Sequence, residues 1–170
     1  YKRQINNSTM DNNPAPGNKR GGLTTILEKS LGAVAKGGKS ILEDVLEYAE
    51  PLKNKGFNFM DSPGYDPVSV TGQVASGANV ICFTTGRGSC FGCKPVPSLK
   101  LSTNTAMYEK MEEDMDINCG TIAEGKEDIE KVGNRIFDLV VNTASGNKSK
   151  SEINGYGDEE FNPWQVGVVM

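Results

Sequence analysis

The sequence predicts an α/β fold with a mainly parallel sheet and helices packed on it, in a Rossmann-like three-layer architecture. Short apolar stretches with strand character alternate with helical patterns along the chain, which is the α/β arrangement. Residues 57–61 and 79–84 read as buried strands, and each runs into a loop that contains Gly. Residues 127–144 show the strongest helical periodicity. These three observations favour strands that end at one edge of a sheet, where α/β proteins bind their ligands.

The first third of the chain gives weaker signals. Residues 1–22 read as an extended arm and loop, because "NNPAPGNKRGG" combines Asn, Pro and Gly. Residues 23–170 are expected to form a single α/β domain. A helix is predicted over about 23–36, ending at Gly37-Gly38. The segment "SILEDVLEYAEP" fits either a short helix or a strand. The apolar stripe of the first helix consists of Leu23, Ile26, Leu27, Leu31 and Val34.

The elements that follow are better defined. "DPVSVTGQVASG" reads as a short helix with Pro67 in its first turn, and "ANVICFTTGRG" is the clearest buried strand. "SLKLST" is expected to be another strand, after which Asn104 can cap the short helix "TAMYEKM". The tail "YGDEEFNPWQVGVVM" reads as an ordered extension with the only Trp. The long helix is expected to pack on the sheet through Ile129, Val132, Ile136 and Val140.

Composition excludes several classes of partner. A chain of 170 residues is long enough for a core, and its net charge of −4 is spread without a basic field for nucleic acid. No stretch is apolar enough to span a bilayer, and "YKRQINNSTM" lacks the apolar centre of a signal peptide, so a cytoplasmic protein is expected. The chain contains no His, the commonest general base and transition-metal ligand. It also begins without Met, which indicates either processing or a fragment of a longer protein.

The cysteines do not form a recognisable metal or redox motif. Cys90 and Cys93 make a single CxxC pair, whereas structural zinc sites usually take two such pairs. A redox dithiol is expected at the start of a helix, but Pro95 and Pro97 follow here. We therefore predict four free thiols and no zinc, with Cys82 in the core and the others as small, partly buried side chains.

The loop "TTGRGSCFG" does not fit the dinucleotide or P-loop patterns, but it suits an anion. Gly86 and Gly88 would let backbone N–H groups approach a ligand closely. Arg87 offers a planar fork for a carboxylate, and Thr84 and Thr85 offer hydroxyl groups for a polyol. The alternative interpretation is a tight turn with Arg87 pointing into solvent, and the residues alone do not separate the two.

Two further loops carry polar candidates. In "PGNKRGG", Asn18 can bond hydroxyls in both directions, and Lys19 can hold a carboxylate or, if desolvated, act as a base. An exposed loop lysine is the structural alternative. Asp61, at a strand end before "SPG", can serve as a ligand or as a turn-forming residue.

Long motifs in the chain resemble the C-terminal part of the altronate/galactarate dehydratase family, and resemble the altronate branch more closely. They are "NPAPGNKRGGLTTILEKSLGAVAKGG", "FMDSPGYDPVSVTGQVASGANVICFTTGRGSCFGCKPVPSLKLSTNTAMYEKMEEDMDINCG" and the closing "NPWQ". Together they extend over about residues 12–165. The family's motifs are present at Asn18, Lys19, Asp61 and residues 84–88 without departure.

The resemblance implies a sugar-acid hydro-lyase that removes water from altronate to give 2-keto-3-deoxygluconate, with galactarate as the alternative substrate. It further implies iron(II) dependence of the full-length enzyme, a missing N-terminal part and a homo-oligomer. No metal ligands are assigned in this chain. From the chemistry, we expect Lys19 and Arg87 to hold or polarise the carboxylate, with hydroxyls held by Asn18, Asp61, Thr84 and Thr85 beside Gly86 and Gly88. A non-catalytic scaffold or a sugar-acid binding module remains an alternative. Convergence of the three loops on one cleft would favour a site.

Overall fold

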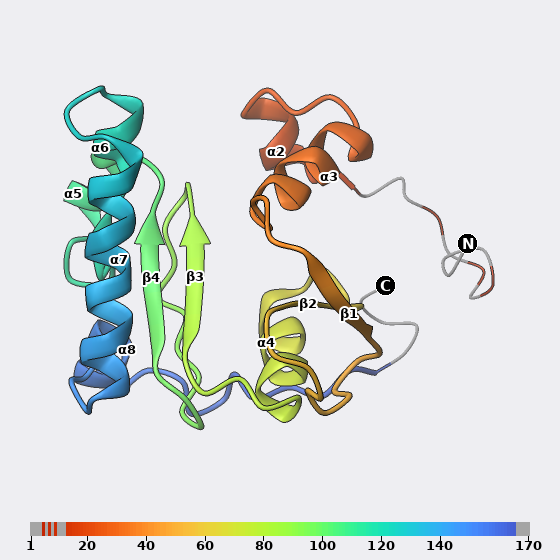
Figure 1. Cartoon of the computed structure of the whole chain (residues 1–170). Helices are drawn as coiled ribbons and strands as arrows, with labels where there is room; N and C mark the ends of the chain where they lie inside the picture. Colours follow the sequence, from red (N-terminus) through yellow and green to blue (C-terminus); the bar gives the residue numbers. More distant parts are fainter. Residues whose placement is uncertain (1–4, 6, 8, 10–12, 166–170) are drawn as a thin grey trace.

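The computed structural model describes residues 5, 7, 9 and 13–165 and has an α/β fold (Figure 1). Its helices are α2 (Pro16–Arg20), α3 (Ile26–Ala35), α4 (Asp66–Ala75), α5 (Thr105–Lys110), α6 (Gly120–Ala123), α7 (Ile129–Ala144) and α8 (Lys150–Ile153). Its strands are β1 (Leu42–Leu46), β2 (Phe57–Met60), β3 (Ile81–Thr85), β4 (Ser98–Ser102) and β5 (Ile117–Asn118). Among the described helices, none has the length and apolar character needed to cross a membrane.

All strand pairs are parallel, which confirms the predicted α/β class. The strands form two sheets, β1-β2 and β3-β4-β5, where one sheet was expected. In the larger sheet, Thr85 is paired with Ser102, which is paired with Asn118. The carboxyl ends of the three strands therefore lie level at one edge. The three-layer detail of the expected architecture stays a prediction.

Helix α7 covers one face of the larger sheet. Leu99 and Leu101 of β4 point to this face and pack with Ile136 and Val140 of α7. The predicted packing on the sheet is confirmed at Ile136 and Val140, and Val132 is completely buried on the same helix. Ile129 was expected to pack as well, and this was wrong: its exposed fraction is 76%, because it opens the first turn of α7 ahead of the buried part of the helix.

The other face of this sheet is covered by the connection between β3 and β4, residues 86–97, which contains no described helix. Phe91 lies in this connection and stacks on Phe83 of β3, with 5.3 Å between ring centroids. Phe91 and Cys93 join the core cluster around Val70. Cys82 was predicted to be a core residue but is exposed, because β3 is the edge strand and Cys82 points away from this cluster.

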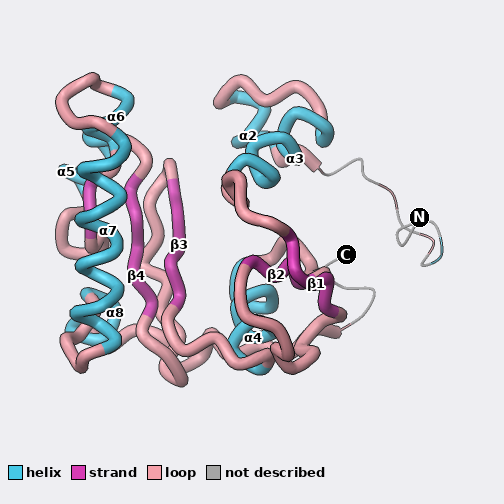
Figure 2. Tube along the Cα trace, in the orientation of Figure 1, coloured by secondary structure: helices cyan, strands magenta, loops and turns pink. Residues whose placement is uncertain are grey.

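The N-terminal helices differ from the prediction. Pro16–Arg20, expected as loop, form the short helix α2 with Pro16 in its first turn, where proline is tolerated. The predicted helix near 23–36 is present as α3, and Figure 2 shows the two helices beyond β1 and β2. The stripe of α3 does not reach a core: Leu27, Leu31 and Val34 are 71–74% exposed.

The smaller sheet resolves one ambiguity and corrects one prediction. The segment that fitted either a helix or a strand contains β1. Strand β2 was predicted to be buried, but Phe57 and Phe59 are exposed. Side chains on the other face of β2 meet α4: Met60 lies against Gly72. Among the described residues, α4 covers one face of the β1-β2 sheet, and the face that carries Phe57 and Phe59 is exposed.

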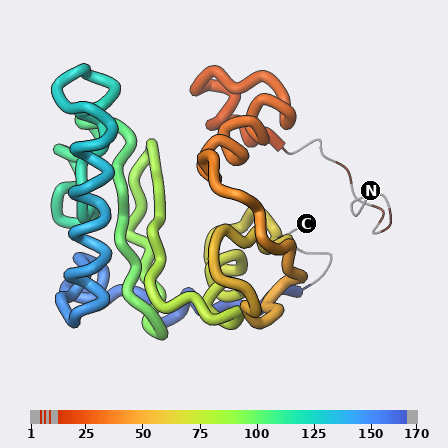
Figure 3. Tube along the Cα trace, in the orientation of Figure 1, coloured from red at the N-terminus to blue at the C-terminus, as the bar shows by residue number. Residues whose placement is uncertain are grey.

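The C-terminal tail is an ordered extension through residue 165, as predicted. It leaves α8 and runs along the base of the larger sheet to α4 (Figure 3). The backbone N–H of Asn162 donates to Thr71 Oγ1 at 2.8 Å, and Trp164 meets Tyr48 edge to face at 5.4 Å between centroids. The tail therefore connects the larger sheet with the α4 layer. Residues 166–170 lie outside the described residues.

The packing of α7 gives a stability prediction. Val132→Ala should lower the free energy of unfolding by about 1.5–3 kcal/mol, since the side chain is fully buried. Ile129→Ala, on the same helix but exposed, should change it by less than about 0.5 kcal/mol. Urea unfolding of both variants measures the difference. Equal effects would mean that α7 does not pack as described.

Candidate functional site

The loop after β3 is closed by one of the residues predicted to bind substrate. Thr85 Oγ1 accepts hydrogen bonds from the backbone N–H groups of Arg87 and Gly88, at 3.3 and 3.1 Å. Gly88 has a φ of +92°, and a Cβ there would overlap Met111 Sδ. The positive φ therefore favours Gly at position 88, where the Met111 side chain lies directly against the backbone. The Thr85 hydroxyl oxygen thus accepts two hydrogen bonds within the loop, and its proton can still be donated to another group.

Residues that follow β4 hold this loop from the side. Thr103 donates through its backbone N–H and its Oγ1 to the carbonyl oxygen of Thr85, at 2.9 and 3.2 Å. Asn104 Nδ2 donates to the carbonyl oxygen of Gly86 at 2.7 Å. Asn104 also caps α5, as predicted, by accepting from the backbone N–H of Met107 at 2.8 Å. Its second role was missed, although adjacent parallel strands that end at one edge bring their following loops together.

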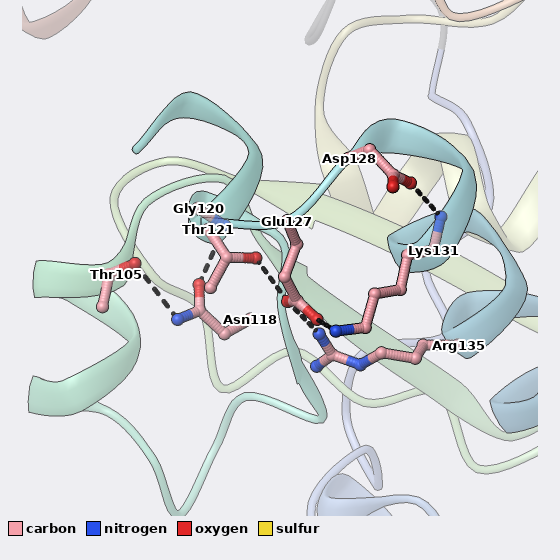
Figure 4. Close-up of polar contacts among 8 residues, drawn as sticks. All are labelled: Thr105, Asn118, Gly120, Thr121, Glu127, Asp128, Lys131 and Arg135. Atoms are coloured by element: carbon pink, nitrogen blue, oxygen red, sulfur yellow. Dashed lines mark hydrogen bonds and ion pairs between the residues drawn. The ribbon is translucent and has the colours of Figure 1, made fainter. Parts of the chain in front are cut away.

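The turn after β5 packs against the start of α5, at Thr105 (Figure 4). A Cβ at Gly120 would overlap the backbone of Asn104 and Thr105, so only Gly allows this approach. Asn118 Nδ2 donates to Thr105 Oγ1 at 3.1 Å, while Asn118 Oδ1 accepts from the backbone N–H of Gly120 at 2.8 Å. The start of α5 is thus fixed between two loops of the same sheet edge.

An acidic side chain fastens the same turn to α7. Glu127 accepts from Thr121 Oγ1 at 2.8 Å and pairs with Arg135 Nη1 at 2.6 Å and Lys131 Nζ at 3.2 Å (Figure 4). The hydrogen bond from Thr121, the bond from Lys131 and the charge of Arg135 lower the pKa of the Glu127 carboxyl. Because Lys131 and Arg135 are both paired with Glu127, we assign them a structural role in holding the turn at Thr121 against α7.

The side chain of Arg87 reaches α2. A Cβ at Gly17 would overlap the Arg87 guanidinium, so this group lies directly against the backbone of Gly17. Asn18 and Lys19 are the next two residues of α2, with Asn18 half-buried and Lys19 exposed. The structure therefore brings together two of the three predicted loops, "GNK" and "TTGRG".

The remaining predicted residues are placed differently. Thr84 is exposed and, by strand alternation, points to the opposite face of β3 from Thr85. Asp61 follows β2 in the other sheet, where its N–H donates to the carbonyl oxygen of Leu46 at 2.9 Å. The "SPG" turn next to Asp61 lines a groove of about 720 Å³ together with Lys36 at the end of α3. Of the described residues lining that groove, none belongs to "GNK" or "TTGRG".

The described residues do not fit a metal centre. The chain has no His, and among residues 5, 7, 9 and 13–165 no group of three or more Cys, Asp or Glu is arranged to hold a metal ion. The four cysteines are free, with Cys93 buried and Cys119 half-buried. Burial raises the pKa of both of these thiols, which keeps them protonated near neutral pH.

The thiol arrangement leads to a chemical prediction. Titration of the denatured, unreduced protein should find all four cysteines as thiols, because none of them forms a disulfide in the structure. Metal analysis of the purified protein should find no stoichiometric zinc. One zinc per chain, or two missing thiols, would contradict this prediction.

The contact between Gly17 and the Arg87 guanidinium leads to a second prediction. Gly17→Ala should displace the Arg87 guanidinium with little loss of stability, because the group that must move is the end of a flexible side chain. Gly21→Ala is a matched control at the C-cap of the same helix, where a Cβ would meet its nearest atom at 3.4 Å. The Nε–Hε NMR signal of Arg87 should shift in the first variant and stay in place in the second. Identical signals in both would exclude the contact.

Comparison with known proteins gives a consistent result. Residues 1–169 match the family described as D-galactarate/Altronate dehydratase, C-terminal. The chain is 43% identical over 150 residues to the galactarate dehydratase (L-threo-forming) of Escherichia coli K12, covering 87% of this chain and 29% of that protein. It is 40% and 37% identical over 158 residues to the altronate dehydratases of Bacillus subtilis 168 and Escherichia coli K12, covering 93% of this chain and 31% of each.

These identities differ too little to separate the two substrates, and the chain spans less than a third of the length of these relatives. The family match, by contrast, extends over almost every residue. The expected resemblance to the family is thereby confirmed. The chain belongs to the D-galactarate/altronate dehydratase family and corresponds to the C-terminal region of its members.

Proposed function

We propose that this chain supplies the carboxylate-binding side of a sugar-acid dehydratase, which acts on altronate to give 2-keto-3-deoxygluconate. Galactarate is the alternative substrate, since relatives named for both acids are similarly identical. The observation that carries the proposal is the contact of the Arg87 guanidinium with Gly17, next to Lys19. This contact brings the Arg87 guanidinium to α2, the helix that also carries Lys19, and it supports a site in which both cations face one sugar acid.

Dehydration of a sugar acid requires positive charge beside the substrate carboxylate. A base removes the proton on the carbon next to the carboxylate, and negative charge moves onto the carboxylate oxygens. The hydroxyl group on the following carbon leaves with a proton as water, and the resulting enol rearranges to the 2-keto acid. A positioned cation stabilises the charge that develops in the first step. Arg87 presents a two-pronged donor for this group, and Lys19 adds a second positive charge.

The other proposed roles follow from position. Asn18 lies beside Lys19 and can bond a substrate hydroxyl, while the Thr85 proton is free to do the same. Gly86 and Gly88 let the loop pass close to Thr103 and Met111, whose side chains a Cβ at these positions would meet. Thr84 and Asp61 reach the same substrate only if it extends across the edge of β3 or toward the smaller sheet, so we assign them the weaker contribution.

Iron(II) is proposed for the full-length enzyme on the family resemblance. Since the described residues of this chain do not form a fitting set of ligands, we propose that its ligands lie in other parts of the polypeptide. The residues above bind and orient the substrate without it.

A scaffold function is the second candidate, and exposed apolar side chains favour it. Leu27, Leu31 and Val34 of α3, with Phe59 on the open face of β2, present apolar surface to solvent. Parallel sheets are normally covered on both faces. We propose that this surface contacts the N-terminal part of the same enzyme, or a second copy in a homo-oligomer. This role is compatible with the substrate-binding one.

Substitution of the arginine tests the proposal. In the full-length enzyme, Arg87→Ala should lower kcat/KM at least about tenfold, because a charge-assisted hydrogen bond to a carboxylate contributes about 1.5–3 kcal/mol. Lys94→Ala is the control: Lys94 is an exposed cation in the same connection, paired with Asp158 at 2.6 Å. It should leave kcat/KM nearly unchanged.

The assay uses altronate and galactarate, each with and without iron(II). Normal turnover by the Arg87 variant would exclude Arg87 from the site and favour the scaffold role. An enzyme that dehydrates neither acid under any of these conditions would refute the proposed function itself.

A further inference from the structure

Asn104 occupies an unusual place between a helix and the proposed substrate loop. Its Oδ1 accepts from the first turn of α5, at Met107, while its Nδ2 donates to Gly86 in the loop after β3. The two bonds use opposite ends of one amide group, so a single side chain joins two elements. The two bonds are similar in length, 2.7 Å to the loop and 2.8 Å to the helix.

The orientation of this amide is fixed by its partners. Met107 presents an N–H and Gly86 presents a carbonyl oxygen, so the oxygen of Asn104 must face the helix and its nitrogen the loop. The backbone of Asn104 is in turn fixed by Gly120, which leaves no room for a side chain there. Asn104 therefore links the sheet edge, through Gly120, to Gly86, the residue just before Arg87.

We propose that Asn104 is a positioning residue for Arg87: it fixes the Gly86 carbonyl and thereby the direction in which the arginine leaves the loop. This inference rests on the proposed function, because it assigns Asn104 a role in holding the carboxylate-binding group. Helix capping alone does not require the donor, since Asp and Ser also cap helices well. The donor end of the amide is what the loop uses.

The two roles can be separated by substitution. Asn104→Asp keeps an oxygen for the Met107 N–H and has no donor for Gly86. Asn104→Ser also keeps a capping oxygen, is too short to reach the loop, and adds no charge. Asp128→Asn is the matched control, because Asp128 caps α7 by accepting from the Lys131 N–H at 2.7 Å, a bond that involves no residue of the Gly86 loop.

Hydrogen exchange and kinetics of the full-length protein provide the test. Both Asn104 variants should speed exchange of the Arg87 and Gly88 amides, while the Met107 amide keeps its wild-type rate. Both should lower kcat/KM about two- to tenfold, the effect expected from one hydrogen bond, mainly through a higher KM. Asp128→Asn should change neither reading at the loop.

Three outcomes would overturn the inference. Wild-type exchange at Arg87 and Gly88 in both variants would show that the loop does not depend on Asn104. Faster exchange at Met107 in step with the loop would show that Asn104 acts only as a cap. Faster amide exchange at Arg87 and Gly88 with unchanged KM and kcat would show that Arg87 needs no such positioning. If the wild-type enzyme dehydrates neither sugar acid, the proposed function fails, and the exchange data still decide whether Asn104 holds the loop.

Discussion

The ammonium group of Lys100 holds the connection between β3 and β4 against the sheet, and the loop that carries Arg87 depends on it. Connections between parallel strands usually contain a helix that satisfies its own backbone groups. Here side chains do this: Lys100 Nζ donates to the carbonyl oxygen of Phe91 at 3.1 Å, and Glu160 accepts from the N–H of Gly92 at 2.7 Å. Lys100 is fully buried, and burial lowers its pKa, although nearby carboxylates oppose this.

A second dependence runs between the two sheets. The tail that supplies Glu160 goes on to bond Thr71 of α4, so one segment stabilises the connection and joins it to the layer beneath β2. On the opposite side, α2 meets Arg87 through Gly17. The loop is thus fixed from the sheet edge, from the tail and from the N-terminal helices, while its own sequence, rich in Gly, supplies little rigidity.

Local rules in the sequence predicted local structure well. The cap at Asn104, the Pro67 helix start and the buried face of α7 depend on a few neighbouring residues, and the structure confirms them. The exposure of Cys82 was not predictable in this way, because it depends on which strand lies at the edge. The chemical likeness of the two loops predicted that Lys19 and Arg87 serve one site, but the contact between Gly17 and Arg87 was not predicted, since no periodicity places a helix beside a loop whose Arg lies 70 residues later.

The alternation along β4 has a consequence for strand alignment. Ser98, Lys100 and Ser102 are buried on one face, and Leu99 and Leu101 on the face of α7. A slip of one residue would turn the ammonium group into the apolar layer under α7 and both leucines into the polar connection. Such a shift is strongly disfavoured, so a single polar stripe sets the register of the sheet. It thereby determines the common level at which the three strands end.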